Sequence, residues 1–146
     1  MAKTVKYFPV AAAKSRKLVD SYNRKYIPGT GLVYSRGKHG GIDIVAPHGA
    51  LVRACHAGTI RLRSFGKAYG LQVTIVAGDG TGFFHAHLSK IKVKEGQKVN
   101  TGEPIGNVGS TGQTSGPHVH FEKRLRWRDW RSIVNPYREL ERARLA

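Results

Sequence analysis

The sequence predicts a mostly β fold, an antiparallel sheet of hairpins in one domain with short helices at the termini. Two observations support this fold class. Short alternating or β-branched segments recur between turn-forming residues, and glycine accounts for 18 of the 146 residues. A chain of this length buries a core of its own. No apolar stretch reaches the roughly 18 residues that a membrane-spanning helix needs.

The strand prediction covers seven segments in chain order. They are Val52 to Cys55, Gly58 to Arg63, Leu71 to Val76, Phe83 to Leu88, Ile91 to Val93, Pro104 to Val108 and His118 to Glu122. Turn signals at hairpin spacing separate several of them, namely Gly78-Asp79-Gly80, Glu95-Gly96 and Ser110-Thr111-Gly112. The single cysteine, Cys55, excludes an internal disulfide, and we expect its side chain to be buried.

The two ends of the chain differ from the middle. Residues 1–33 are predicted to be a basic lead-in that packs on the core or carries charge, with helix-forming residues from Ala11 to Lys25. Residues 34–137 form the predicted central domain and 138–146 a basic C-terminal helix. We expect Asn135-Pro136 to begin that helix, with asparagine as N-cap and proline in the first turn.

The charge balance predicts an anionic partner. The chain has 25 Lys+Arg against 9 Asp+Glu, a formal net charge of +16. Such a field attracts nucleic acids, anionic membranes and wall polymers rich in phosphate and carboxylate alike, so charge alone does not select among them.

Five of the seven histidines fall into three short motifs, together with one aspartate. The motifs are His39-Gly-Gly-Ile-Asp43, His85-Ala-His87-Leu88 and Gly-Pro-His118-Val-His120-Phe121. Residues i and i+2 of a strand share a face, so each His-x-His pair is predicted to face one cavity. The remaining histidines, His48 and His56, lie in turn-like sequence and are predicted to be exposed bystanders.

These motifs predict a catalytic zinc site. His39 and Asp43 flank two glycines, which give both side chains the freedom to reach one ion. Two imidazoles and one carboxylate suit zinc. Three protein ligands leave a fourth position open, as a catalytic site requires. Each motif alone is weak evidence, but three of them together favour the metal.

The motifs resemble those of the lysostaphin/LytM-type zinc endopeptidases of bacterial cell walls. The quoted segments, with Ala86-His87-Leu88-Ser89, Gly102-Glu-Pro-Ile105-Gly106 and Gly109-Ser-Thr-Gly112, occur in the order of that family. The resemblance implies an antiparallel, barrel-sandwich-like fold of the duplicated-hybrid-motif type with an open groove. It implies one Zn²⁺ per chain held by His39, Asp43 and His120, and catalysis by His87 and His118. The implied substrate is the peptide part of peptidoglycan.

The sequence departs from the family at His85, where an aromatic residue is usual. His85 is predicted either to hydrogen-bond another site residue or to line the groove. Which of His87 and His118 is the general base, which peptide bond is cut and the oligomeric state all stay open.

Two other functions fit parts of the sequence. One is a non-catalytic wall-binding or activator module of the same fold, and the other is a basic nucleic-acid-binding protein, suggested by the charge and by Trp127 and Trp130. The ends are expected to bind anionic wall polymers or an outer-membrane surface, with no specific nucleic acid.

The first ten residues lack an apolar run of signal-peptide length, because Pro9 interrupts the run around Phe8. Together with the small size and the strong positive charge, this predicts a phage lysis enzyme, which stays in the host cytoplasm until lysis and then acts on the wall. An exported enzyme whose signal peptide has been removed is the alternative.

Overall fold

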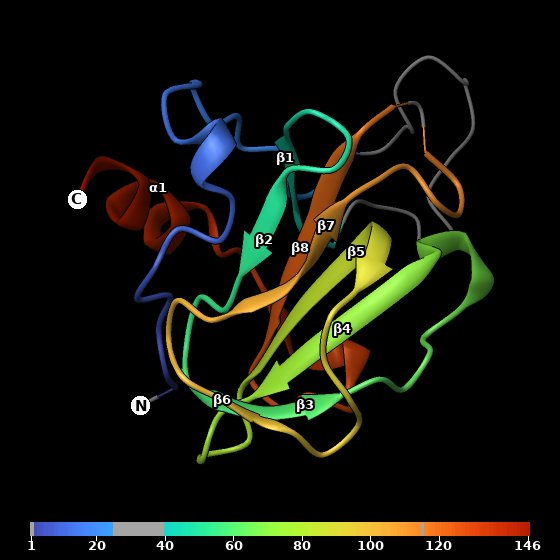
Figure 1. The fold of residues 1–146 in the computed structure, drawn as a ribbon. Coiled ribbons are helices and arrows are strands. Elements are labelled where there is room, and N and C mark those ends of the chain that lie inside the picture. The colour runs from blue at the N-terminus through green and yellow to red at the C-terminus, as the bar shows by residue number, and fades with distance from the viewer. Residues whose placement is uncertain (1, 25–39, 115) are drawn as a thin grey trace.

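The computed structural model describes residues 2–24, 40–114 and 116–146 (Figure 1). Its strands are β1 (Ile42–Val45), β2 (Leu51–Arg53), β3 (Gly58–Arg61), β4 (Leu71–Val76), β5 (Gly82–Ile91), β6 (Lys98–Val99), β7 (Pro104–Val108), β8 (His118–Arg124) and β9 (Ile133–Val134). Its helices are the 3-10 turns η1 (Ala11–Ala13), η2 (Lys67–Tyr69) and η3 (Trp130–Ser132) and the α-helix α1 (Tyr137–Leu145).

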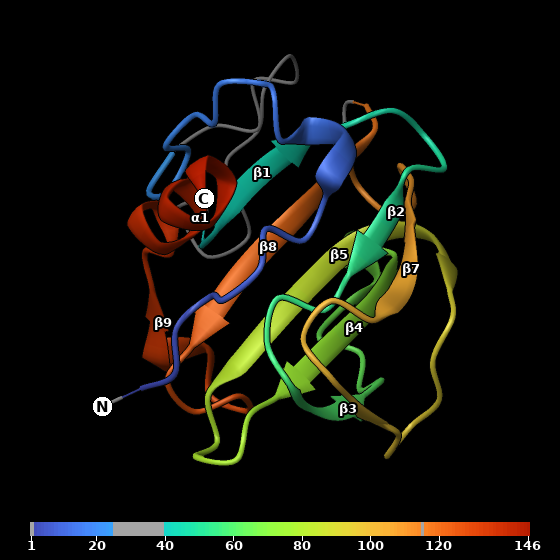
Figure 2. The ribbon, with the colours of Figure 1, turned by 60° about the vertical axis from the view of Figure 1, so that its left-hand side comes forward.

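The strands form a nine-stranded sheet in which every pairing is antiparallel. The order along its main path is β1-β8-β5-β4-β3-β6, and β7 joins β2 to β5. Strand β8 therefore lies between β1 and β5, as Figures 1 and 2 show. This arrangement confirms the predicted fold class. It also places a neighbouring strand on each side of the His118-Val-His120 motif.

The strand predictions agree closely with the sheet in its longer elements. The predicted Ile91 to Val93 strand is wrong as a separate element, because β5 continues without a break to Ile91. Strand β1, which follows directly on the His39–Asp43 motif, was not predicted. The two-residue strands β6 and β9 also escaped prediction, since two residues are too few to show alternation.

The core lies against the sheet and includes residues from the predicted lead-in. Val5, Phe8 and Val10 are buried in the same cluster as the strand residues. The backbone of this segment also bonds to β2 and the loop after it, with Arg53 N–H donating to Pro9 O at 2.8 Å and Lys6 N–H to Cys55 O at 2.9 Å. The described part of the lead-in therefore packs on the core. Cys55 is fully buried, as expected, and burial raises the pKa of its thiol.

The two terminal segments pack against each other (Figures 1 and 2). Tyr137 Oη donates to Leu18 O at 3.3 Å, and Arg144 Nη1 donates to Lys14 O at 3.2 Å. Helix α1 begins at Tyr137 with Pro136 at its N-cap, so the predicted cap at Asn135 with proline in the first turn was wrong by one residue, although Asn135 Oδ1 accepts from Tyr137 N–H at 3.0 Å. Within Ala11 to Lys25, the helical part of the described residues is only the single turn η1.

Across the described residues, no helix combines the length and the hydropathy that crossing a membrane would take.

Candidate metal centre and catalytic site

Strand β8 places four chemically active side chains in a row. Its alternation puts His118, His120, Glu122 and Arg124 on one face, because every second residue of a strand points the same way. Three of them are nearly or fully buried, with exposed fractions of 5% for His120, 0% for Glu122 and 1% for Arg124. The row therefore forms a line of mostly buried polar side chains along one face of the sheet.

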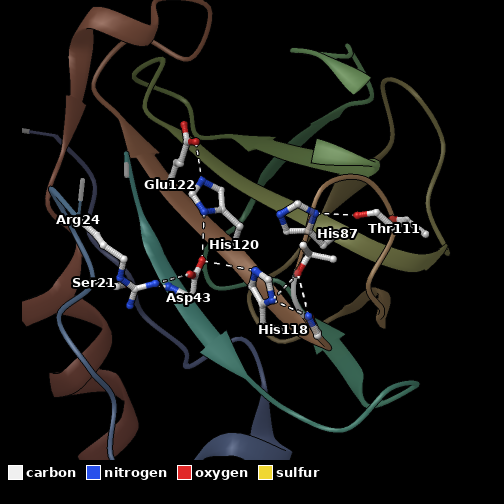
Figure 3. A network of polar contacts seen from close by, with 10 residues as sticks. Ser21, Arg24, Asp43, His87, Thr111, His118, His120 and Glu122 are labelled. Carbon is white, nitrogen blue, oxygen red and sulfur yellow. Dashed lines mark hydrogen bonds and ion pairs between the residues drawn. The ribbon is translucent and has the colours of Figure 1, made fainter. Parts of the chain in front are cut away.

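Strand β1 brings Asp43 directly beside this row. The antiparallel register pairs Asp43 with His120. Asp43 Oδ1 lies 3.2 Å from His120 Nδ1 and 3.5 Å from His118 Nε2 (Figure 3). One carboxylate oxygen thus faces two imidazole nitrogens, and Ser21 Oγ fixes the aspartate backbone by accepting a hydrogen bond from its N–H at 3.0 Å.

Gly41 permits this close approach of β1 and β8. A Cβ at position 41 would lie 2.2 Å from the carbonyl oxygen of Phe121 and 3.0 Å from Glu122 Cγ. Backbone atoms cannot move aside, so only glycine fits there. Close packing of the two strands therefore explains why glycine stands at position 41, whereas the motif alone suggested backbone flexibility as the reason.

His120 presents its two ring nitrogens to two carboxylates. Nε2 lies 2.7 Å from Glu122 Oε2, and Nδ1 faces Asp43. Burial by itself lowers the pKa of His120, but the hydrogen bonds to Asp43 and Glu122 outweigh it and raise the pKa. Burial alone raises the pKa of Glu122, and the neighbouring His120 and Arg124 reverse that, so its pKa is lowered.

His118 and His87 are held by backbone carbonyls. His118 Nδ1 lies 2.8 Å from Gly116 O, and His87 Nδ1 lies 2.7 Å from Thr111 O. A carbonyl only accepts, so each Nδ1 carries a proton. The other nitrogen, Nε2, is then the one that can exchange a proton, and in His118 it faces Asp43 Oδ1 at 3.5 Å. The two rings lie 4.9 Å apart, centre to centre. Burial, with the charges of His118 and His120, lowers the pKa of His87 to about 4.

A β-bulge turns His87 toward the other site residues. On β4 the register advances by two residues from Val73 to Leu71, whereas on β5 it advances by three from His85 to Leu88. The extra residue falls at Ala86–His87, where His87 has a φ of 63°. That left-handed conformation is uncommon outside glycine and costs on the order of 1–3 kcal/mol, a strain typical of functional positions.

His85 consequently does not share a cavity with His87, and that prediction was wrong. The bulge breaks the i, i+2 alternation between them. His85 is fully buried, packs edge-on against Phe121 with ring centres 5.2 Å apart, and bonds through Nδ1 to Val73 O at 3.2 Å. Full burial excludes it from lining a groove, and the partners of its ring, Val73 and Phe121, are not site residues.

The donor set fits zinc. Asp43 supplies a carboxylate oxygen and His120 an Nδ1 directed at it, while Glu122 occupies the other nitrogen of His120, as carboxylates commonly do for metal-binding histidines. The third predicted ligand, His39, lies outside the described residues. Within the described ranges, no three His, Cys, Asp or Glu side chains are arranged as a complete metal site.

Sequence reasoning missed several residues of this site. Glu122 and Arg124 continue the i, i+2 row of the His-x-His motif, which is the signal that points to them. Thr111 was visible only as part of a turn, although its carbonyl holds His87. Arg24, whose Nη1 lies 3.4 Å from Asp43 Oδ2, gave no signal because its contact spans distant segments.

The remaining histidines and tryptophans lie elsewhere. His48 is exposed, as predicted, but His56 is buried and stacks on Phe83 with ring centres 5.6 Å apart, so its predicted exposure was wrong. Trp127 is partly buried against Phe65, whereas Trp130 is 51% exposed.

The fold and the site together define a class, an antiparallel β domain carrying the histidine–carboxylate cluster of a metallopeptidase. Comparison with known proteins agrees, since the profile of Peptidase family M23 matches residues 37–133. The chain belongs to Peptidase family M23, and the lysostaphin/LytM-type resemblance is confirmed.

Three similar proteins illustrate the relationship. The DD-carboxypeptidase/endopeptidase Mpg of Neisseria meningitidis is 45% identical over 87 residues, which make up 60% of this chain and 20% of that protein. The catalytic domain of lysostaphin from Staphylococcus simulans has a TM-score of 0.73 and 29% identity, covering 86% of this chain and 92% of the domain. A zinc-containing peptidase from Vibrio cholerae has a TM-score of 0.69 and 32% identity, covering 86% and 38%.

The chain spans about a fifth of the length of the curated Neisseria relatives that it matches. The similarity therefore concerns one domain of those proteins.

Proposed function

We propose that this protein is a zinc-dependent endopeptidase that hydrolyses peptide bonds of bacterial peptidoglycan. The observation that supports it best is the division among the site histidines. His120 gives its second nitrogen to a carboxylate and turns Nδ1 to Asp43, whereas His87 and His118 give theirs to backbone carbonyls. The first arrangement suits a metal ligand and the second suits proton transfer.

The metal proposal assigns three ligands. His39, Asp43 and His120 would hold one zinc ion, His39 on the strength of its motif alone. When bound, zinc supplies the positive charge that acidifies a water molecule and polarises the scissile carbonyl.

The proton chemistry belongs to His87 and His118. Each has Nδ1–H committed to a carbonyl, so each Nε2 is the atom that accepts or donates a proton. One Nε2 removes the proton of the attacking water, and the other, protonated, donates to the oxygen that becomes negative as the carbonyl is attacked. The low pKa of His87 keeps it neutral near pH 7.

A set of alanine variants separates these roles. We expect His39→Ala, Asp43→Ala and His120→Ala to lose both zinc and activity, and His87→Ala and His118→Ala to lose activity while keeping zinc. Exposed His48→Ala is the matched control and should keep both. Metal content by elemental mass spectrometry checks the division, and a zinc-free His118→Ala protein would contradict it.

The substrate is tested with purified peptidoglycans of two cross-link types. After incubation with the zinc-loaded protein, mass spectrometry should find new free amines at one defined peptide bond. Intact peptides from both walls, with zinc bound, would instead indicate a non-catalytic binding or activating role.

We also propose that the terminal segments hold the enzyme on anionic wall polymers or an outer-membrane surface. Lys14 and Lys17 of one segment and Arg138 and Arg142 of the other are exposed, and the contacts between the segments place them on neighbouring surfaces. Attraction between exposed charges is screened beyond about 8 Å at physiological ionic strength. Binding to purified walls in a sedimentation assay should therefore weaken as salt rises from 0.05 to about 0.5 M, while activity on a soluble peptide substrate changes little.

A high positive charge that concentrates the enzyme on the wall supports a bacteriolytic role, and we propose a phage lysis enzyme acting from the host cytoplasm. Expression in a bacterial cytoplasm tests this proposal. Lysis only when a membrane-permeabilising protein is co-expressed is the expected result, and unchanged growth under that condition would count against it.

A further inference from the structure

Glu122 is a carboxylate with no exposed surface. It is 0% exposed, and each of its two oxygens has a partner within the described residues. Oε2 lies 2.7 Å from His120 Nε2, and Oε1 accepts from Arg124 Nε at 3.2 Å and Nη2 at 2.8 Å. Such a buried charge persists only with partners of this quality.

Arg124 is in turn fixed by aromatic rings. Its guanidinium carbon lies 4.3 Å from the ring centre of Phe65 and 5.2 Å from that of Phe84. These two cation–π contacts hold the guanidinium in place. With an exposed fraction of 1%, it has no route to solvent, so its charge is balanced by Glu122.

Packing leaves Glu122 no room to turn away. Gly41 lies so close that a Cβ there would be 3.0 Å from Glu122 Cγ. Phe84 pairs with Glu122 from the strand on the other side. The carboxylate is therefore clamped between β1 and β5 as well as by Arg124.

The consequence for His120 is a choice of ring nitrogen. A carboxylate accepts hydrogen bonds only, so Nε2 must carry the proton that Glu122 accepts. Asp43 Oδ1 faces Nδ1 in the same way at 3.2 Å, but Glu122 holds the shorter contact at 2.7 Å, so Nε2 keeps its proton and Nδ1 is the nitrogen left for a metal.

We propose that Glu122 is a positioning residue, held by Arg124, that makes Nδ1 of His120 the metal-facing nitrogen. This inference rests on the proposed zinc site and adds the device that prepares one of its ligands before the metal arrives. A purely structural ion pair would instead stabilise the sheet and leave zinc affinity unchanged once the protein is folded.

The test compares zinc affinity in matched variants. Glu122→Gln keeps the size of the side chain but loses the charge and offers His120 an NH₂ group as readily as an oxygen. Glu139→Gln is the control, because Glu139 pairs with Lys123 at 2.7 Å, on the other face of the same strand. Chelator competition should show zinc bound about 10- to 100-fold more weakly by Glu122→Gln, and wild-type affinity for Glu139→Gln even where its stability falls.

A spectroscopic signature separates positioning from stability. Long-range ¹H–¹⁵N correlation of the zinc-loaded wild type should show His120 protonated at Nε2 alone, and Glu122→Gln should show loss or exchange of that proton. Should Glu122→Gln fail to fold, Arg124→Lys retains the charge but loses the two-point contact, and we expect it to weaken zinc binding several-fold.

Failure of the positioning role can be distinguished from failure of the proposed function. Absence of zinc binding by the wild type would overturn the proposed function. Zinc binding by the wild type with equal affinity in Glu122→Gln, or in Arg124→Lys where that variant is needed, would overturn the positioning role alone.

Discussion

Thr111 shows how much of the site one residue outside the histidine motifs can organise. Its carbonyl accepts from His87 Nδ1, its Oγ1 donates to Leu88 O at 2.6 Å, and the same Oγ1 accepts from Leu71 N–H at 3.1 Å. These three contacts tie the bulged end of β5 to the start of β4. Thr111 therefore stabilises the strained backbone of His87 as well as its ring.

We predict that Thr111→Val lowers kcat about tenfold, with little change in KM or zinc content. Valine keeps the shape but loses both hydroxyl contacts, each worth about 1 kcal/mol, and about 1.4 kcal/mol in the barrier is a tenfold rate change. Thr111→Ser keeps the hydroxyl and is the control. Steady-state kinetics on a peptide substrate measures the difference, and equal kcat values for the two variants would refute the role.

His85 makes folding stability depend on pH. Burial lowers its pKa from 6.5 to about 4, so between those values the unfolded chain binds a proton that the folded chain does not. Stability from this residue is complete above pH 6.5 and is lost as the pH falls toward 4, by an amount on the order of 3 kcal/mol. In the described part of the chain, Nε2 of His85 also has no hydrogen-bond partner.

We predict that His85→Phe flattens this dependence. Phenylalanine keeps an aromatic ring against Phe121 and removes both the titrating group and the unpaired nitrogen. Urea unfolding of metal-free protein at pH 7.5 and pH 5 should show a smaller loss of stability for the variant than for the wild type. Exposed His48→Ala should behave like the wild type, and an unchanged slope in His85→Phe would exclude His85 as the source.

At the scale of elements, the pairing of β1 with β8 decides whether the site assembles. Asp43 reaches His120 only because Gly41 lets the two strands close. Hydrogen bonds in the ladder and the position of the carboxylate therefore depend on the same glycine.

We predict that Gly41→Ala destabilises the fold by about 1–3 kcal/mol, since overpacking against backbone forces the strands apart, and weakens zinc binding by displacing Asp43. Gly78→Ala is the control, because a Cβ at position 78 has nothing within 4 Å. Thermal unfolding and chelator competition measure both effects. Wild-type behaviour of Gly41→Ala in both assays would show that β1 does not position Asp43.

The elements also show where sequence reasoning succeeds and where it fails. Alternation of side chains located β4, β7 and β8, because long strands carry a period of two that is legible residue by residue. The same rule misplaced His85, because the bulge at His87 is a property of how β5 pairs with β4 and leaves no mark in β5 alone. Contacts between distant segments, such as Arg24 with Asp43, are equally hidden.

At the scale of the whole molecule, the folding unit extends past the region that matches the family. Phe8 is 4% exposed and belongs to the central core, although it lies far before residue 37. Glu139 of α1 accepts from Val5 N–H at 2.9 Å, so the two terminal segments complete the fold together.

We predict that Phe8→Ala costs about 3–5 kcal/mol of unfolding free energy, the usual result of emptying a buried aromatic site. Its neighbour Tyr7 is 38% exposed, and Tyr7→Ala should cost much less. Denaturant unfolding compares the two. Equal and small losses would mean that the segment before residue 37 is an appendage.

Because of the extra residue at Ala86–His87, the site depends on how β5 pairs with β4 as well as on which residues β5 contains. If β5 paired with β4 as a regular ladder with the same residues, His87 would point to the side that His85 occupies, away from His118. A protein could then contain all the residues of the histidine motifs and still be unable to carry out the reaction. The bulge in β5 is therefore needed for the chemistry. Judging whether a related sequence is active requires checking the number of residues between its paired strand positions as well as the motif residues themselves.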